Sequence, residues 1–281
     1  MSRVAYVNGA YVPLVGAVVS IMDRGFQFAD SIYEVWAVRS GRMFDVDEHM
    51  ARLQRSLTEL RIAAPMGAAA LLAVLRETIR RNHVRNGIVY VQISRGAANR
   101  DHAFPSPEPK PTIVVTAKNL DSRPIAARAE NGVKVITLAE TRWARRDIKS
   151  VNLLPNVLAR QTAKEHGAFE AWFVDADGLI TEGTSSTAWI VDSDGVLCTR
   201  PLSNDLLHGV TRVKVLRLAQ EQQFRIAERP FTAQEAKSAR EAFLTGASNA
   251  ATAVVEIDGV RIGEGRPGPV TQALRAAYLG I

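Results

Sequence analysis

The sequence predicts an α+β fold with mixed or antiparallel sheets. Turn pairs typical of hairpins recur along the chain, at Asn8-Gly9, Ser40-Gly41 and Asp194-Gly195. Segments with helical spacing alternate with segments rich in β-branched and aromatic residues. The frequent hairpins between them favour α+β over a doubly wound parallel sheet.

The first part of the chain supports this fold class element by element. In chain order, the expected elements are a hairpin over 4–21, a strand over 32–38, helices over 46–60 and 66–84, and strands over 88–96 and 111–117. The stretch 97–110 is polar and rich in proline, so we expect a loop there. Turn residues at Lys118–Pro124 indicate a linker, which predicts two domains, 1–120 and 121–281.

The second part continues the same alternation. In chain order we expect a strand over 132–138, a helix over 152–166, strands over 171–174 and 187–192, a helix over 211–222, strands over 224–227 and 242–245, and a helix over 269–279. Gly167 follows the helix over 152–166, at the position where a helix commonly ends.

Composition and charge exclude several classes of protein. The chain has 281 residues, of which 47% are hydrophobic and 23% charged, values that exclude a disordered chain or a coiled-coil rod. No apolar run reaches the ~20 residues that span a bilayer. The first residues show no secretory signal, and the lone Cys198 excludes a disulfide framework and a cysteine-based zinc cluster. We therefore expect a cytoplasmic protein with neither membrane nor metal partners.

The net charge of +6 does not indicate a nucleic-acid partner. The 28 arginines and seven lysines are spread along the chain, and no nucleic-acid-binding motif is present. The common signatures GxGxxG, P-loop, HExxH and GxSxG are also absent. The five histidines lack metal-ligand spacing, so we predict no metal site.

Lys149 is the lysine with the most informative surroundings. It lies in Asp147-Ile148-Lys149-Ser150, between a strand-like stretch and a predicted helix, next to basic residues. An amine in such a place is a candidate for covalent catalysis. The spacing alone leaves a solvated surface lysine open.

Five segments in order resemble the fold-type-IV (class IV) aminotransferases, which use pyridoxal phosphate. They are RGFQFADSIYEV at 24–35, FDVDEHMARL at 44–53, DIKSVNLLPNVLA at 147–159, ITEGTSST at 180–187 and FLTGASNAATAV at 243–254. The resemblance covers nearly the whole chain and implies a two-domain fold with most of the cofactor site in the C-terminal domain. RGAANRDHAFP at 95–105 is most similar to the D-amino-acid aminotransferases, which carry an Arg-x-His pair in this loop.

The resemblance assigns expected roles to residues of the cofactor site. Lys149 corresponds to the lysine that bonds covalently to pyridoxal 5'-phosphate and moves the substrate proton. Glu182 corresponds to the carboxylate that faces the pyridine nitrogen and keeps it protonated, so that the ring accepts electrons from Cα. Without the family, Glu182 would be taken as a turn residue before Gly183.

Other positions correspond to residues that hold the ring and the phosphate. They are Arg52 and the helix start Gly209-Val210-Thr211 for the phosphate, Leu207 against the ring, and the polar run Thr184, Ser185 and Ser186. From periodicity alone, Arg52 is equally well a solvent-exposed helical arginine. Ala247 stands where the family usually has a phosphate-binding threonine, so Ser248 or a backbone N–H is expected to substitute.

Tyr33, Arg100 and His102 correspond to the residues that hold the substrate α-carboxylate in the D-specific enzymes. An arginine offers a forked pair of donors to a carboxylate, and a nearby histidine adds another. Read without the family, Tyr33 is a core tyrosine, and Arg100 and His102 belong to a flexible polar loop. In the family this loop reaches the neighbouring subunit's active site, which implies a homodimer.

The expected function is transamination between a D-amino acid, such as D-alanine or D-glutamate, and a 2-oxo acid. Within the same fold, a branched-chain L-amino-acid aminotransferase, an aminodeoxychorismate lyase and an (R)-amine aminotransferase stay open. A catalytically silent anion-binding protein is the alternative from another class.

Overall fold

The chain divides into two compact units in the computed structural model, which describes residues 3–280. The first unit comprises residues 1–121 and 148–152, and the second comprises 122–147 and 153–281. The short return of Ile148–Asn152 to the first unit differs from the simple division into 1–120 and 121–281 that the linker suggests. It places Lys149 in the first unit.

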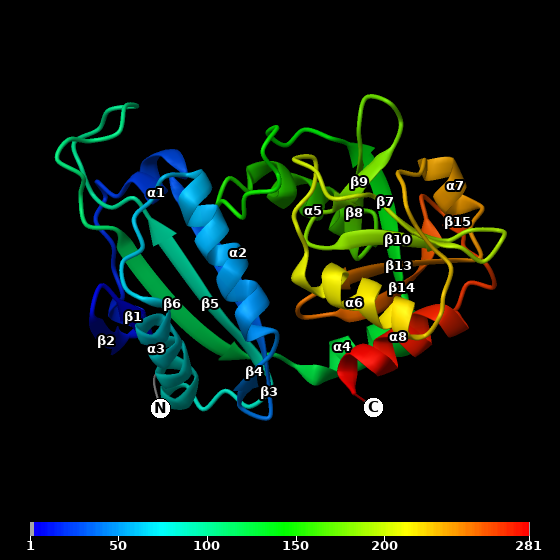
Figure 1. The fold of residues 1–281 in the computed structure, drawn as a ribbon, viewed down its shortest axis with the longest axis horizontal. Helices are drawn as coiled ribbons and strands as arrows, with labels where there is room; N and C mark the ends of the chain where they lie inside the picture. The colour runs from blue at the N-terminus through cyan, green and yellow to red at the C-terminus, as the bar shows by residue number, and fades with distance from the viewer. Residues whose placement is uncertain (1–2, 281) are drawn as a thin grey trace. The chain divides into compact units, whose positions relative to one another are not determined.

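A six-stranded antiparallel sheet forms the first unit, in the order β2-β1-β6-β5-β3-β4 (Figure 1). Its strands are β1 Val4–Val7, β2 Ala10–Pro13, β3 Ser31–Arg39, β4 Arg42–Met43, β5 Gly87–Ser94 and β6 Thr112–Asn119. Its helices are the short 3-10 turn η1 Leu14–Gly16, α1 Arg24–Phe28, α2 Val46–Glu59 and α3 Ala68–Arg81. Every predicted strand and helix of this region is present except the strand expected after β2, in the last part of the 4–21 segment.

Residues 17–20 form no strand, although the sequence predicts one there. The hairpin ends with β2 at Pro13, after the expected turn at Asn8-Gly9. Within residues 3–280, no strand pairs with these residues to complete their backbone hydrogen bonds, and the Val18 side chain is exposed. β-Branched composition alone was not sufficient to form a strand.

Amphipathic helices α2 and α3 account for the core of the first unit. Their buried apolar residues lie three or four positions apart, as at Leu53 and Leu57 in α2 and Leu71 and Leu75 in α3. These residues pack onto the sheet, where α2 lies against β3 and α3 against β6 (Figure 1). The polar stretch 97–110 is a loop, as predicted.

A nine-stranded mixed sheet forms the second unit, in the order β12-β11-β10-β13-β14-β7-β8-β9, with β15 paired to β14. Its strands are β7 Val133–Ala139, β8 Glu170–Val174, β9 Ile180–Gly183, β10 Thr187–Val191, β11 Leu197–Thr199, β12 Ile226–Glu228, β13 Glu241–Gly246, β14 Ala250–Ile257 and β15 Val260–Arg261. Its helices are α4 Ser122–Asn131, α5 Leu154–Glu165, α6 Val210–Glu221, α7 Ala233–Lys237 and α8 Pro269–Leu279. The mixed sheet confirms the predicted α+β class.

The predicted linker is shorter than expected. Strand β6 continues to Asn119 and helix α4 begins at Ser122, so only residues 120–121 connect them. Pro124 lies in the first turn of α4, where the missing proline N–H costs no hydrogen bond. The proline that suggested a linker therefore begins a helix.

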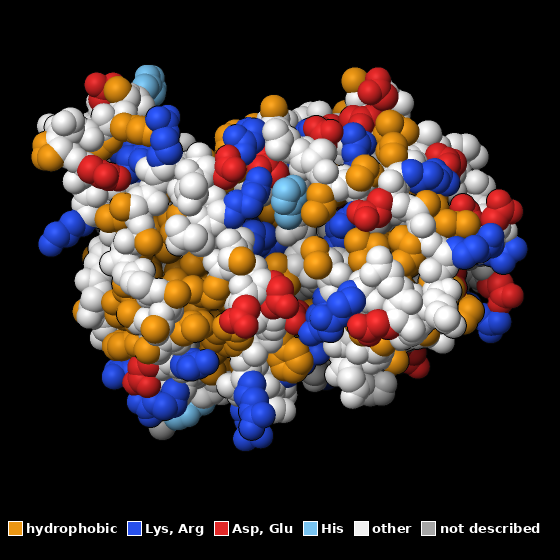
Figure 2. All heavy atoms as spheres, viewed as in Figure 1, with side chains coloured by type: hydrophobic (Ala, Val, Ile, Leu, Met, Phe, Trp, Pro, Cys, Tyr) orange, Lys and Arg blue, Asp and Glu red, His pale blue; other side chains and the backbone are white. Residues whose placement is uncertain are grey.

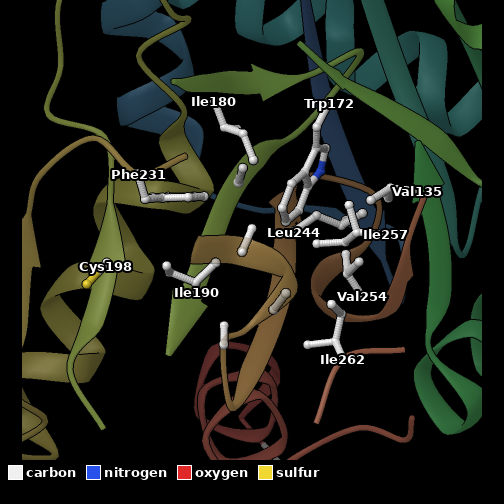
Figure 3. Close-up of a cluster of buried hydrophobic side chains, with 14 of the residues drawn as sticks. Val135, Trp172, Ile180, Ile190, Cys198, Phe231, Leu244, Val254, Ile257 and Ile262 are labelled. Atoms are coloured by element: carbon white, nitrogen blue, oxygen red, sulfur yellow. The ribbon is translucent and has the colours of Figure 1, made fainter. Parts of the chain in front are cut away.

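Buried apolar residues fill the second unit on both faces of its sheet. One cluster packs the bulky side chains Trp172, Ile190, Phe231 and Leu244 together (Figure 3). A second cluster joins α6 and α8 to the sheet through Val215, Leu274 and their neighbours. This packing supports the ends of β9 and β13 and the start of α6, which carry the expected cofactor residues.

The surface carries both basic and acidic side chains. Basic and acidic side chains are interspersed over the face seen in Figure 2, with no continuous basic surface there. None of the helices within residues 3–280 combines the length and the apolar character that crossing a bilayer demands.

Candidate active site

Lys149 is held by strand β3 of the first unit. The Lys149 carbonyl accepts a hydrogen bond from the Tyr33 N–H at 2.9 Å, and the Val151 N–H donates to the Ser31 carbonyl at 3.0 Å. These bonds align residues 148–152 alongside β3. Helix α5 begins only at Leu154, so Lys149 lies outside the helix start that the sequence suggested.

The amine of Lys149 lies against Tyr33. Its Nζ is 4.1 Å from the centroid of the Tyr33 ring, and the Tyr33 ring stacks on Tyr90 at 5.7 Å. Burial and the neighbouring Tyr33 raise the pKa of Tyr90 to about 12. Tyr33 lies on the half-buried face of β3 and Glu34 on its fully buried face. Lys149 and Tyr33 are thus adjacent, as the expected site requires.

Arg52 is paired with a buried glutamate that the sequence analysis missed. The Arg52 guanidinium donates to Glu34 through Nε at 2.8 Å and Nη2 at 2.7 Å, in a two-pronged ion pair. His49 Nδ1 lies 2.9 Å from Glu34 Oε1. Arg52 is therefore not a solvent-exposed helical arginine. A glutamate on the buried face of an otherwise apolar strand, opposite His49 and Arg52 at helical spacing, was the available signal.

The charge of Glu34 is stabilised by its neighbours. Burial by itself would raise the pKa of Glu34, but the charge of Arg52, the hydrogen bonds from His49 and Arg52, and the charge of Lys149 outweigh it. The pKa of Glu34 therefore lies well below its ordinary value. This lowered pKa favours the charged form of Glu34, which holds the Arg52 guanidinium in place.

Glu182 is buried in the second unit and held by two donors. Arg142 Nη1 donates to Glu182 Oε1 at 2.6 Å, and the Leu207 N–H donates to the same oxygen at 3.1 Å. Both bonds end on Oε1, so within residues 3–280 they leave the second carboxylate oxygen for another donor. A protonated pyridine nitrogen is a donor of the required kind.

Burial raises the pKa of Glu182, and the nearby charge of Glu140 adds to this effect. The Arg142 guanidinium and the Leu207 N–H lower the pKa by less. Arg142 also donates to Glu140 through Nε and Nη2, at 2.9 and 2.6 Å, so one guanidinium serves two carboxylates. A carboxylate with raised proton affinity is a strong acceptor for a pyridinium N–H.

The polar run after Glu182 is turned toward another buried carboxylate, Glu170. Thr184 Oγ1 donates to Glu170 at 2.9 Å, Ser185 Oγ at 3.2 Å, and Ser186 Oγ donates to its other oxygen. Each hydroxyl thereby uses its only proton. The Thr184 N–H donates to the Ala171 carbonyl at 3.0 Å and the Ser185 N–H to Glu170 at 3.2 Å, so these two residues can offer a cofactor only acceptor oxygens. Glu170, which fixes this turn, is a second residue that the sequence analysis missed.

Helix α6 begins where the resemblance places a phosphate site. Its N-cap, Gly209, provides no side-chain cap, and Val210 and Thr211 are buried in the first turn. A Cβ at Gly209 would lie 2.9 Å from Thr187 Oγ1, so the close packing there requires glycine. Uncapped N–H groups at a helix start suit an anion. Ser248 is exposed in the turn between β13 and β14, next to the half-buried Ala247.

Arg100 and His102 are exposed on the loop 97–110 and meet at one ring. The Arg100 guanidinium lies 5.0 Å from the Phe28 centroid, and the His102 ring lies 5.5 Å from it. The contacts described for Tyr33 lead to Lys149 and Tyr90 rather than to this pair. The structure thus brings Arg100 and His102 together but does not join them to Tyr33 within one chain.

The donor set fits pyridoxal phosphate and provides no metal centre. The second unit by itself provides a buried carboxylate with a spare oxygen and an uncapped helix start, which suit the pyridine nitrogen and the phosphate of that cofactor, and the first unit provides the Lys149 amine, which suits its aldehyde. Among residues 3–280, no group of three histidine, cysteine, aspartate or glutamate side chains is placed to hold a metal ion.

Comparison with known proteins gives consistent results. The family model for amino-transferase class IV matches residues 31–257. The chain is 38% identical to a D-alanine aminotransferase of Staphylococcus haemolyticus, over 97% of this chain and 95% of that protein. It is 39% identical to a D-alanine aminotransferase of Bacillus licheniformis, over 96% and 94%.

Solved structures share the fold. The branched-chain amino acid aminotransferase from Escherichia coli matches with a TM-score of 0.90 and 26% identity, over 100% of this chain and 94% of that one. The T.th. branched-chain amino acid aminotransferase with pyridoxamine 5'-phosphate matches with a TM-score of 0.89 and 27% identity, over 99% and 93%. The chain belongs to the class IV aminotransferases.

Proposed function

We propose that this protein transfers an amino group between a D-amino acid, such as D-alanine or D-glutamate, and a 2-oxo acid, using pyridoxal 5'-phosphate. The observation that carries the proposal is the similarity to D-alanine aminotransferases over nearly the full length of both chains. Arg100 and His102, exposed together beside Phe28, are the carboxylate-binding pair such a substrate needs.

Lys149 and Glu182 have distinct roles in this proposal. Pyridoxal phosphate supplies an electron-accepting ring when it is bound. Lys149 Nζ would hold the cofactor covalently, and its amine would accept the proton from the substrate Cα as a general base. Glu182 keeps the pyridine nitrogen protonated through its second oxygen. The raised pKa of Glu182 suits that hydrogen bond.

The remaining proposed cofactor contacts are to the phosphate and the ring. Arg52, oriented by Glu34, and the backbone N–H groups of Val210 and Thr211 hold the phosphate. Leu207 packs against the ring, and its N–H orients Glu182. The other expected cofactor contacts are Thr184, Ser185 and Ser248.

Stereochemistry requires three fixed points on the substrate. These are the cofactor bond, the Lys149 amine and a carboxylate site formed by Tyr33, Arg100 and His102, which we call the carboxylate clamp. A D-amino acid held there presents its Cα hydrogen to Lys149. An L-amino acid held by the same clamp presents its side chain.

We propose a homodimer in which the loop 97–110 serves the partner's active site. This explains why Arg100 and His102 are exposed and apart from Tyr33 within one chain. Large apolar side chains are also exposed at Val15, Ile21 and Phe26, which suits burial against a second copy. A cytoplasmic location stays part of the proposal, and cell fractionation tests it.

A substrate screen tests the proposed activity. The purified protein should absorb visible light owing to the bound cofactor. With pyruvate or 2-oxoglutarate as acceptor, it should turn over D-alanine or D-glutamate faster than the L-forms. A protein without visible absorbance and without turnover would instead be a silent anion-binding relative. Elimination without transamination would indicate the aminodeoxychorismate lyase alternative.

Arg100→Ala tests the carboxylate clamp. Loss of a charge-assisted partner costs roughly 1.5–3 kcal/mol, or about ten- to a hundredfold in kcat/KM for amino acids. An amine without a carboxylate should react as before. Arg80→Lys, an exposed exchange on α3, is the matched control.

Mixing two variants that are each impaired on D-amino acids tests the shared site. Dimers of Lys149→Ala lack the base, and dimers of Arg100→Ala lack the clamp. A mixed dimer contains one site with both residues if the loop crosses to the partner. Activity recovered on co-refolding supports that arrangement, and no recovery places the loop in its own subunit's site.

The branched-chain alternative is favoured by the structural neighbours, which are branched-chain aminotransferases at 26–28% identity. Efficient turnover of L-leucine or L-valine, with Arg100→Ala indifferent, would promote it over the D-specific function. Preference for a plain (R)-amine would promote the (R)-amine aminotransferase.

A further inference from the structure

The loop 97–110 carries Arg100 and His102 of the proposed carboxylate clamp but has little structure of its own. It contains neither helix nor strand beyond a single bridge between Asp23 and Ala97. Residues 99–104 are exposed. A clamp on such a loop binds a carboxylate well only if something else fixes the main chain, because ordering a loop on binding costs affinity.

Arg24 makes the connections that fix this main chain. Its side chain is only 4% exposed. Nη1 donates to the carbonyls of Asp101 at 2.6 Å and Ala103 at 3.2 Å, and Nη2 donates to the carbonyl of His102 at 3.3 Å. Three consecutive carbonyls, including that of a clamp residue, therefore end on one guanidinium.

Asp30 orients this guanidinium and shares its charge with a second arginine. Arg24 Nε donates to Asp30 at 2.8 Å, and Arg95 Nε donates to the same oxygen at 2.7 Å. Arg95 also donates to the carbonyls of Leu60 and Arg61, beyond the end of helix α2. The Arg24–Asp30–Arg95 triad therefore ties the loop to the end of α2.

Two aromatic rings extend these contacts. The Arg24 guanidinium lies 4.8 Å from the Phe28 centroid, on the same ring that Arg100 and His102 contact. The Arg95 guanidinium lies 3.7 Å from the centroid of Phe104, two residues after His102. The triad thus contacts the loop at residues 101–104, around and just after the clamp residues.

We propose that Arg24 is a positioning residue that, with Asp30 and Arg95, pre-orders the 100–103 segment and thereby sets the affinity for the substrate carboxylate. The inference rests on the proposed function, because it concerns the same carboxylate site. Arg24 touches no substrate; it acts through the main chain that carries Arg100 and His102.

Lysine is the informative replacement for Arg24. An ammonium can still pair with Asp30, but it lacks the planar fork that reaches three carbonyls. Arg24→Lys therefore keeps the buried charge and releases the loop. Asp30→Asn, which weakens the triad from the opposite side, serves as the second variant if Arg24→Lys does not fold. Arg80→Lys on α3 is the matched control.

Limited trypsin digestion measures the order of the loop without reference to activity. The Arg100–Asp101 bond lies in the anchored segment, and its cleavage is followed by mass spectrometry on the holoenzyme. We expect cleavage about tenfold faster in Arg24→Lys than in the wild type, with no change in Arg80→Lys. Equal cleavage rates in the wild type and in both triad variants would overturn the proposal.

Steady-state kinetics then separates positioning from general damage. With D-alanine, Arg24→Lys should raise KM about tenfold and leave kcat within about twofold, because the carboxylate contact is made in ground and transition states alike. Turnover of an (R)-amine without a carboxylate should be unchanged. Faster cleavage with unaltered KM would also overturn the proposal. A wild type inactive on both D-alanine and D-glutamate would refute the proposed function, while the digestion result still decides whether Arg24 anchors the loop.

Discussion

Each of the two units buries a glutamate, and the surroundings of the two carboxyl groups shift their pKa values in opposite directions. Glu34 in the first unit has a guanidinium, a histidine and the Lys149 amine around it, and its pKa falls. Glu182 in the second unit shares one guanidinium with Glu140, and its pKa rises. Burial alone therefore does not set the charge of a buried acid. The number of cationic groups next to each carboxylate also decides its charge.

This difference matches the two proposed roles. A carboxyl group with a lowered pKa, as at Glu34, suits a structural role, because it holds the Arg52 guanidinium in one orientation. A carboxylate with raised proton affinity, as at Glu182, suits the proposed role of sharing a proton with a ring nitrogen. Substitutions at the two glutamates and at Lys149 test whether the two units differ in this way.

Replacing Lys149 by alanine should have the largest effect. Loss of both the covalent anchor and the general base should lower kcat by about a thousandfold or more. Borohydride reduction of the wild type followed by peptide mapping should locate the cofactor on Lys149. A label on any other lysine would refute the assignment. Lys164→Ala, an exchange on α5, is the control.

Glu182→Gln should have the next largest effect. A neutral amide holds a protonated pyridine nitrogen poorly, so the transamination rate should fall by about a hundredfold or more, while the fold persists. Stopped-flow measurement of the half-reaction with D-alanine checks this. Unchanged rates and unchanged cofactor spectra would remove Glu182 from the mechanism.

Glu34→Gln should act on stability first. The substitution leaves the Arg52 guanidinium, 9% exposed, without its anionic partner, which costs about 3 kcal/mol of unfolding free energy. Urea denaturation at neutral pH measures the loss. Glu77→Gln on α3, where the carboxylate is solvated, should change stability little. Equal losses in both variants would mean that the Glu34–Arg52 pair does not stabilise the first unit.

The pH dependence of stability should distinguish the two glutamates with a smaller effect. The pKa of Glu34 is lowered from 4.5, so its contribution is present above about pH 4.5 and is lost as the pH falls. The pKa of Glu182 is raised from 4.5, so its contribution is present below about pH 4.5 and is lost as the pH rises. The difference in unfolding free energy between the wild type and Glu34→Gln should become smaller as the pH falls. The corresponding difference between the wild type and Glu182→Gln should change in the opposite direction. If both differences changed in the same direction with pH, the opposite pKa shifts of the two glutamates would be contradicted.

Local pattern was sufficient to predict most elements of the fold. The helical spacing of α2 and α3 and the Asn8-Gly9 turn are visible in the sequence, because each depends on residues a few positions apart. The failures occur where a distant neighbour decides. Residues 17–20 have strand composition but no pairing strand, and Pro124 begins a helix rather than a linker.

The candidate site was predictable only through motifs. Lys149 and Glu182 were identified from the segments around them, whereas Glu34, Arg142, Glu170 and Arg24 were missed. Each missed residue acts through a partner distant in the chain, as Arg142 does on Glu182 across forty positions. Spacing along one element cannot show such pairs, because the fold creates them.

The return of Ile148–Asn152 to the first unit has a consequence for recombining this protein with its relatives. A gene cut at residue 121 would yield a first unit without Lys149 and without the strand-like segment beside β3. A chimera joined there would take its reactive lysine from one parent and the tyrosine beneath that lysine from the other. Shuffled enzymes should therefore work best when Tyr33 and residues 148–152 come from the same parent, although more than a hundred residues separate them in the gene.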